Sequence, residues 1–157
     1  MYIDTASTSD ISALCDLAAM LEPAEGDFFG RRHQQVRRLG NLLLAKEHAH
    51  VLCIRHQDEI IAMLTMSSTN PGSEQPAIMQ LNEIVVQPSY RNQGAASTLL
   101  HAAITQARQA GWGKITVLLT DISQQAQQQL SRFGFVHTAG QQMQLNLKAS
   151  KTALSVA

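Results

Sequence analysis

The spacing of apolar residues predicts that the chain begins with a short strand followed by two helices. Residues 2–5 fit a strand, and the capping residues at 8–10 precede apolar positions three or four residues apart. This first helix should end near Pro23, because a residue before proline avoids the helical region. A second helix is expected over 33–46, with Val36, Leu39 and Leu43 facing the core.

Three strands are expected next. Two apolar runs, 51–54 and 60–66, surround a short polar turn and predict an antiparallel hairpin. The segment 67–76 is rich in turn-forming residues and should be a loop. Residues 78–87 then predict the central strand, which ends in the β-branched run Ile84-Val85-Val86 before Pro88.

The pattern changes from strand to helix after the sequence Arg91-Asn92-Gln93-Gly94-Ala95-Ala96. Leu99, Leu100, Ala103 and Ala107 recur at helical spacing, and Gly111 is a typical end for that helix. A buried strand at 115–119, a short helix around Ala126 and Leu130, and two final strands at 135–137 and 142–147 complete the series. The tail 148–157 has no periodicity and should fray, so a single domain is expected over 1–147.

Composition narrows the function classes. The chain has 157 residues, a formal net charge of zero and a pI near 7, which argues against binding to nucleic acid. It has no apolar run of roughly 18 residues and no signal-like N-terminus, so no membrane association is expected. Cys15 and Cys53 lie in apolar patterns without a CxxC motif, and the six histidines have no metal-ligand spacing. A cytoplasmic protein with two buried thiols and no metal is therefore expected.

The turn around Gly94 has the chemistry of an anion-binding site. The first backbone N–H groups of a helix lack internal partners and lie at the positive end of its dipole. Gly94, Ala95 and Ala96 leave space for a phosphate, and Arg91 adds a charged donor. These features favour a pyrophosphate site. A purely structural turn is the alternative, since the Lys-Ser/Thr of a nucleotide P-loop and the three glycines of a dinucleotide motif are missing.

The whole order V-V-x-P-x-Y-R-x-x-G-x-A-x-x-L-L, at 85–100, resembles the acetyl-CoA-binding core of the GCN5-related N-acetyltransferase (GNAT) superfamily. The pattern Ala126…Leu130…Gly134-Phe135 is similar to the second CoA-contacting region of that family. The resemblance implies an α/β fold of order β-α-α-β-β-β-α-β-α-β-β, with a mixed sheet splayed between strands 81–87 and 115–119. It also implies acetyl-CoA as co-substrate, its pantetheine arm pairing with the backbone in that gap. The implied cofactor-binding residues are Ile84, Val85, Val86, Arg91, Asn92, Gln93, Gly94, Ala95, Ala96, Ser97, Ser123 and Ala126.

Glu83 is the candidate general base. It stands in an otherwise apolar strand, where burial of a carboxylate is unfavourable and should raise its pKa. By alternation it shares a face with Leu81 and Val85, whereas Asn82 faces the opposite side. In the family, a glutamate at this position often accepts the proton of the attacking amine. The alternative is a carboxylate held in a structural salt bridge.

Two positions depart from the family pattern. Leu130 stands where many members have a tyrosine that protonates the leaving thiolate, and Ser123 stands where an asparagine is common. Three interpretations follow: the thiolate leaves unassisted or through water, another side chain such as Tyr90, Thr120 or Ser123 supplies the proton, or the domain binds CoA without catalysis. Loss of a general acid slows a reaction by about 10²–10⁴-fold and does not forbid it.

The acceptor is expected to contact the segment 22–30, where Glu25, Asp27, Phe28 and Phe29 offer carboxylates and phenyl rings to a partly apolar cation. An ordinary solvated loop is the alternative. The arginines at 31, 32, 37 and 38 suit a substrate carboxylate or phosphonate, or form a solvated helix face. The expected function is therefore acetyl transfer from acetyl-CoA to a primary amine of a small molecule or amino acid. A non-catalytic acyl-CoA-binding domain and a protein lysine or N-terminal acetyltransferase are alternatives, and a homodimer is possible.

Overall fold

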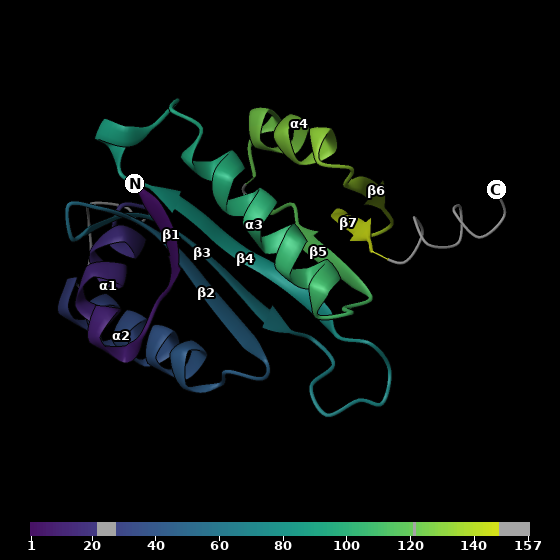
Figure 1. Cartoon of the computed structure of the whole chain (residues 1–157), viewed down its shortest axis with the longest axis horizontal. Helices are drawn as coiled ribbons and strands as arrows, with labels where there is room; N and C mark the ends of the chain where they lie inside the picture. Colours follow the sequence, from purple (N-terminus) through teal and green to yellow (C-terminus); the bar gives the residue numbers. More distant parts are fainter. Residues whose placement is uncertain (22–27, 121, 148–157) are drawn as a thin grey trace, which may run out of the picture. The chain divides into compact units, whose positions relative to one another are not determined.

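A computed structural model describes residues 1–21, 28–120 and 122–147 (Figure 1). The order of strands and α-helices is the expected β-α-α-β-β-β-α-β-α-β-β, with two short 3₁₀ helices added. The elements are β1 Tyr2–Thr5, η1 Thr8–Asp10, α1 Ile11–Ala19, α2 Phe28–Leu44, β2 Ala49–His56, β3 Glu59–Ser68, β4 Ile78–Val86, η2 Pro88–Tyr90, α3 Ala95–Gln109, β5 Lys114–Leu118, α4 Gln124–Arg132, β6 Val136–Thr138 and β7 Gln142–Asn146.

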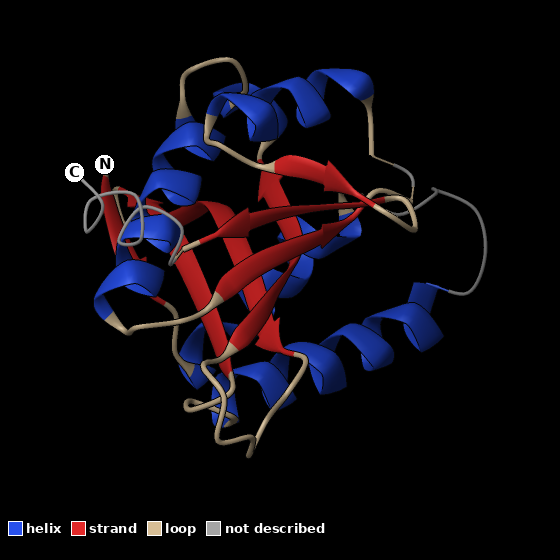
Figure 2. Ribbon diagram, turned by 90° about the vertical axis from the view of Figure 1, so that its right-hand side faces the viewer, coloured by secondary structure: helices blue, strands red, loops and turns tan. Residues whose placement is uncertain are grey.

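The seven strands have the order β1-β2-β3-β4-β5-β7-β6, and Figure 2 shows them in red. The sheet is mixed, because β4 and β5 are parallel while β1–β2, β5–β7 and β6–β7 are antiparallel. By internal contacts the chain divides into two compact units. Unit 1 comprises Met1–Met66 and Glu83–Leu100, and unit 2 comprises Ser67–Asn82 and His101–Ala157.

The hairpin of unit 1 explains why its strands are longer than the apolar runs alone suggested. Gln57 and Asp58 have φ angles of 52° and 65°, so both turn residues are left-handed. This is what a two-residue type I′ hairpin turn requires, and its twist matches that of the flanking strands. The turn needs only these two residues, so β2 continues to His56 and β3 begins at Glu59.

Helices α1 and α2 contact each other and enclose the core of unit 1 (Figure 1). Leu14, Leu17 and Leu39 are fully buried there, with Met63 of β3 and Val85 of β4 in the same cluster. Both cysteines are 0% exposed, as expected. Burial raises the pKa of the Cys15 thiol and raises that of Cys53 to about 11, so both remain protonated at neutral pH.

Arg55 of β2 ties the N-terminal segment to the hairpin. Its Nε donates to Asp4 at 2.8 Å, and its two terminal nitrogens donate to the Asp10 carboxylate at 3.0 and 2.9 Å. The Ser7 amide also donates to Asp10, at 2.8 Å. The hydrogen bonds from Arg55, aided by Ser7, lower the pKa of Asp10 although desolvation opposes them.

Unit 2 is built around β5, which pairs with β4 on one side and β7 on the other. Helix α3 ends at Gln109, and Gly111 just beyond it has a φ of 74°, the left-handed conformation typical of the residue after a helix C-terminus. Trp112 follows and is 8% exposed, with its amide bonded to the Ala107 carbonyl. This places the single tryptophan of the chain in the packed interior of unit 2.

The second helix differs from the expectation at both ends. It begins at Phe28 rather than 33 and ends at Leu44 rather than 46, so residues 28–30 are helical rather than part of a loop. The helix includes Gly30, and a glycine inside a helix lowers the stability of that helix by only about 1 kcal/mol. The helix also continues through Gly40. Among the described residues, no helix combines the length and apolar character needed to cross a membrane.

Candidate functional site

The segment between β4 and α3 is a compact turn with two left-handed residues. Pro88 begins the 3₁₀ turn η2, which needs no amide at that position. Asn92 and Gly94 then have φ angles of 62° and 83°, and α3 begins at Ala95. Asparagine and glycine are the residues that adopt this conformation most readily. The sequence Arg91-Asn92-Gln93-Gly94 is therefore suited to lead the strand directly into the helix.

The start of α3 has the properties expected of an anion site. The Thr98 amide donates to the Gly94 carbonyl at 2.9 Å, so the amides of Ala95 and Ala96 precede the hydrogen-bonded turns of the helix. Residues 91–94 are exposed. Apart from Gly94 itself and its two chain neighbours, no heavy atom of the described residues lies within 4 Å of the position that a Cβ on Gly94 would occupy. This open space, next to amides at the positive end of a helix, fits a diphosphate.

Polar side chains of the turn bind its own backbone. Arg91 Nε donates to the Val86 carbonyl at 3.3 Å, and Gln93 Nε2 donates to the Ser89 carbonyl at 3.3 Å. The Thr98 hydroxyl donates to the Gly94 carbonyl at 2.8 Å. Arg91 thus fastens the turn to the end of β4 with one of its five N–H donors. Its expected contact with phosphate stays a prediction.

Glu83 lies on β4 with 12% of its side chain exposed, and Arg38 of α2 pairs with it. Arg38 Nη1 donates to Oε2 at 2.5 Å and Nη2 donates to Oε1 at 3.0 Å, which is a two-point contact. The Thr65 hydroxyl of β3 donates to Oε2 at 3.0 Å. All three residues belong to unit 1. The carboxylate is therefore paired, and three donors occupy three of its roughly four acceptor positions.

Arg38 is itself held by a neighbour on its helix. The Gln35 side-chain oxygen accepts from Arg38 Nε at 2.9 Å and from Nη2 at 2.7 Å. The Arg38 side chain is 37% exposed, so the cation is more accessible to solvent than the carboxylate. These contacts form one group, the Arg38–Glu83 cluster, which comprises Gln35, Arg38, Thr65 and Glu83.

Sequence reasoning missed Thr65 and Gln35 and placed Arg38 only within a set of arginines. Thr65 is 0% exposed and stands in the apolar run of β3. Thr65, like Glu83, is a polar residue in an otherwise apolar strand, and this pattern could have identified it as a candidate site residue. Gln35 and Arg38 are one helical turn apart and border the buried Leu39, so they lie at the edge of the apolar face of α2.

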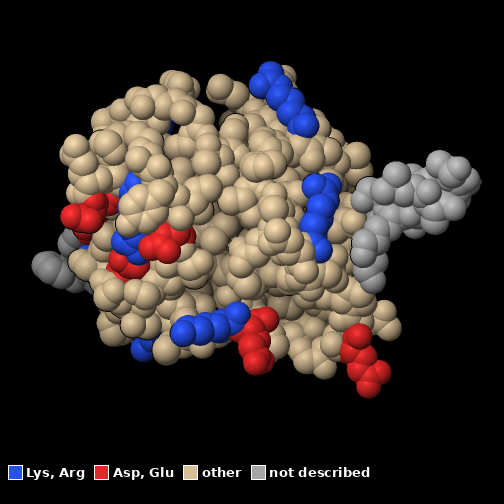
Figure 3. All heavy atoms as spheres, viewed as in Figure 1, with Lys and Arg blue, Asp and Glu red and all other residues tan. Residues whose placement is uncertain are grey.

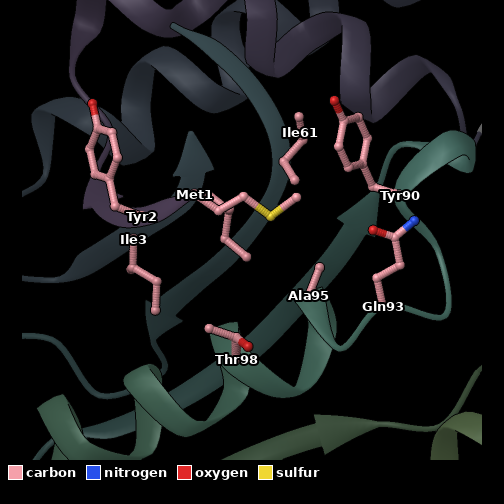
Figure 4. A pocket seen from close by; sticks show the side chains of 9 residues that line it. Met1, Tyr2, Ile3, Ile61, Tyr90, Gln93, Ala95 and Thr98 are labelled. Atoms are coloured by element: carbon pink, nitrogen blue, oxygen red, sulfur yellow. The ribbon is translucent and has the colours of Figure 1, made fainter. Parts of the chain in front are cut away.

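A pocket of about 320 Å³ lies beside the same turn, within unit 1 (Figure 4). Figure 4 shows side chains from β1, β3 and the start of α3 around it, with Met1 between Ile3 and Ile61. Tyr90 lies in its wall, and its ring meets His56 edge-on at 5.8 Å between centroids. Gln93 and Ala95, two expected cofactor-binding residues, also line it. The turn before α3 therefore borders this pocket.

The other expected cofactor residues lie along β4 or in unit 2. Val85 is 1% exposed, while Ile84 and Val86 are half-buried. Ser123 is the N-cap of α4, where its hydroxyl accepts from the Ala126 amide at 3.1 Å. Leu130 is 5% exposed and offers no proton donor. The contacts of Ser123 and Ala126 with CoA stay predictions.

The pairing between β4 and β5 is short. It joins Ile78, Met79 and Gln80 to Lys114, Ile115 and Thr116, although both strands continue beyond these residues. Leu81 and Asn82 therefore lie past the end of the paired region within unit 2. This early end of pairing agrees with the splayed parallel strands expected from the sequence.

The expected acceptor-binding side chains lie outside the part of the chain that the structure describes, so their role stays a prediction. Glu25 and Asp27 lie outside the described residues. Phe28 and Phe29 begin α2, but their side chains are likewise outside the description. Arg32 pairs with Asp16 at 2.8 Å. Figure 3 shows acidic and basic side chains mixed on one face, and within 1–21, 28–120 and 122–147 no cluster of His, Cys, Asp or Glu is suited to a metal.

Solved structures with the same fold include N-acetyltransferases. An N-acetyltransferase from Staphylococcus aureus Mu50 has a TM-score of 0.72 at 17% identity, over 94% of this chain and 98% of the other. The PaiA N-acetyltransferase from Thermoplasma acidophilum, in complex with coenzyme A, has a TM-score of 0.68 at 15% identity, over 93% and 99%. An aminoglycoside 6'-N-acetyltransferase from Acinetobacter haemolyticus has a TM-score of 0.66 at 23% identity, over 88% and 92%.

A search of curated proteins found no match. The sequence model of the acetyltransferase (GNAT) family matches residues 15–135, which contain the Arg38–Glu83 cluster and the turn before α3. The element order and the early end of β4–β5 pairing agree with that match. This chain therefore belongs to the GNAT acetyltransferase family.

Proposed function

We propose that the protein transfers the acetyl group of acetyl-CoA to a primary amine of a small molecule, with Glu83 as the proton acceptor. The observation that carries the proposal is a nearly buried carboxylate on β4, with one acceptor position that no other described residue occupies. It lies in the same unit as the amides at the start of α3. These are the two elements that amine acetylation requires, a base and an anchor for the diphosphate of the donor.

Acetyl-CoA supplies the activated acetyl thioester when bound. The amides of Ala95 and Ala96, with Gly94 leaving space beside them, are proposed to bind its diphosphate. The backbone N–H of Val86 is proposed to donate to the acetyl carbonyl. The next amide, of Gln87, donates to Ile61 of β3, and neighbouring amides of a strand point in opposite directions, so the Val86 amide points away from β3.

Glu83 acts on the acceptor. A free alkylammonium has a pKa near 10, so it must lose a proton before it can attack. Glu83 takes that proton directly or through one water, at the acceptor position that Arg38 and Thr65 leave open. The neutral amine attacks the thioester carbonyl directly, the C–S bond breaks, and CoA leaves as a thiolate that takes a proton from water, because Leu130 has none to donate. No enzyme thiol takes part, which fits two cysteines that are fully buried.

A second candidate is a domain on the same fold that binds acyl-CoA without catalysis. Two observations favour it: Glu83 is held in an ion pair, and the buried Leu130 has no proton to donate. Both candidates predict that acetyl-CoA raises the melting temperature by mass action. They differ in turnover.

Release of free CoA in the presence of a panel of amines separates the two. Under the first proposal at least one amine supports turnover, and Glu83→Gln lowers it by about 10²–10⁴-fold while acetyl-CoA binding persists. Binding of acetyl-CoA with no turnover of any amine would establish the second candidate instead.

Two control variants exclude an indirect effect. Glu47→Gln removes an exposed carboxylate and should leave turnover unchanged. Glu83→Gln alone leaves Arg38 without its ion-pair partner, which is itself destabilising. The double variant Glu83→Gln/Arg38→Gln removes both charges, so it should regain thermal stability and stay inactive.

A further inference from the structure

The Arg38–Glu83 cluster presents an acceptor with two charges rather than one. Arg38 contacts both oxygens of Glu83, and it is the more exposed of the two side chains. An amine reaches the cluster as a cation, because its pKa is near 10. It therefore meets a guanidinium already placed beside the carboxylate that it needs.

A simple cation is poorly suited to this arrangement. At the open acceptor position of Glu83, it lies beside the Arg38 guanidinium, so two cations share one carboxylate. A like charge so close is unfavourable unless a second anion balances it. The other members of the cluster, Gln35 and Thr65, are neutral and supply no compensating charge.

The cluster has hydrogen-bonding positions left on both its cation and its anion. Of the five N–H donors of a guanidinium, Arg38 uses two with Gln35 and two with Glu83, which leaves one on Nη1 in the contacts of the described residues. Glu83 likewise has about one acceptor position left. The cluster thus has one open donor on its cation and one open acceptor on its anion.

We propose that the acceptor is an α-amino acid, whose carboxylate binds Arg38 while its amine binds Glu83. The four groups then alternate in charge, so each cation lies between two anions and the cluster stays neutral. In an α-amino acid the amine and the carboxylate are joined through one carbon, which suits two binding groups that are themselves in contact. This assignment rests on the proposed function and names its acceptor class.

The test uses matched sets of acceptors with the full-length protein and acetyl-CoA. Leucine, phenylalanine, histidine and glutamate are each compared with the corresponding amide and the corresponding decarboxylated amine. For at least one set, kcat/KM should be about 10- to 100-fold higher for the amino acid, as expected for a hydrogen-bonded charge pair.

Variants of Arg38 locate the effect. Arg38→Gln should raise KM for the amino acid by a similar factor and leave KM for the decarboxylated amine unchanged or lower. Arg38→Lys keeps the charge but loses the two-point contact, so it should be intermediate. Arg37→Gln is the matched control, because Arg37 is an exposed neighbour on the same helix whose guanidinium lies near His33 rather than Glu83. It should change neither value.

The outcomes separate this inference from the proposed function. Turnover of amines with equal or better kcat/KM for the decarboxylated member of every set would overturn the α-amino acid assignment and leave the acetyltransferase standing. An equal loss for all acceptors in Arg38→Gln, with unchanged melting temperature, would also overturn it. Absence of turnover with every amine would overturn the proposed function itself.

Discussion

At the scale of single residues, ionised side chains do two different tasks in unit 1. Arg38 and Glu83 form a neutral pair with one open position on each member. Arg55 instead contacts two carboxylates, Asp4 and Asp10, and Ser7 occupies part of the second. The first arrangement is suited to bind something, whereas the second is closed and structural.

Asp10→Asn should therefore destabilise the protein without a specific effect on acceptor preference. Loss of a charged partner of Arg55 should lower the free energy of unfolding by about 2 kcal/mol at pH 7. Arg55 and Ser7 lower the pKa of Asp10 in the folded state, so its contribution is complete above the ordinary value of 3.8 and is lost as the pH falls through the folded value. Urea unfolding of both proteins from pH 7 to pH 3 measures this difference.

Asp58→Asn is the control, because Asp58 is exposed in the hairpin turn and asparagine tolerates its left-handed backbone. The expected difference between Asp10→Asn and the wild type is constant near neutrality and shrinks below pH 4. A difference that persists unchanged at pH 3 would contradict this account of Asp10.

At the scale of elements, the turn between β4 and α3 joins backbone conformation to anion binding. Gly94 needs its left-handed φ of 83° to begin the helix, and no side chain in the described ranges fills the space beside it. Gly111, at the other end of α3, has a similar φ of 74° and also has open space around it. The two glycines have the same backbone requirement at opposite ends of one helix.

Gly94→Ala and Gly111→Ala should each destabilise the protein by roughly 1–2 kcal/mol, because alanine is strained in the left-handed region. Only Gly94→Ala should also weaken binding of acetyl-CoA. Relief of the strain at position 94 shifts the amides of Ala95 and Ala96, which are proposed to bind the diphosphate, whereas relief of the strain at position 111 does not. Urea unfolding and calorimetric titration measure the two effects. Equal affinity for acetyl-CoA in both variants would argue against a diphosphate at the start of α3.

The elements could be predicted from local sequence signals. Contacts between residues distant in sequence could not. Pro88, Gly94 and Gly111 mark where β4 ends and α3 begins and ends, because each acts on its own backbone. The start of α2 was placed five residues too late, at 33 instead of Phe28, because the apolar positions used to locate the helix begin only at Val36. The pairing of Arg38 with Glu83 joins positions 45 residues apart, and no local pattern distinguishes Arg38 from its neighbouring arginines.

At the scale of the whole molecule, the two cysteines report on the interior of unit 1. Cys15 of α1 and Cys53 of β2 are both 0% exposed in one core cluster, and burial raises the pKa of each. A thiol reagent needs both access and the thiolate form.

In the native protein at pH 7.5, Ellman's reagent should therefore label neither cysteine over minutes, and both should react at once in denaturant. Serine at either position is a control that should reduce the denatured value from two thiols to one. Rapid labelling of the native protein would contradict the packing of this core. Slow labelling also permits thiol detection of released CoA with little background from the protein.

Trp112 provides a complementary spectroscopic signal from unit 2. It is the single tryptophan of the chain and lies in unit 2, whereas both thiols lie in unit 1. Indole fluorescence and cysteine labelling thus follow different parts of the same polypeptide without any added dye. Superimposable melting curves from the two signals identify one cooperative structure, and separated curves identify two that melt in succession.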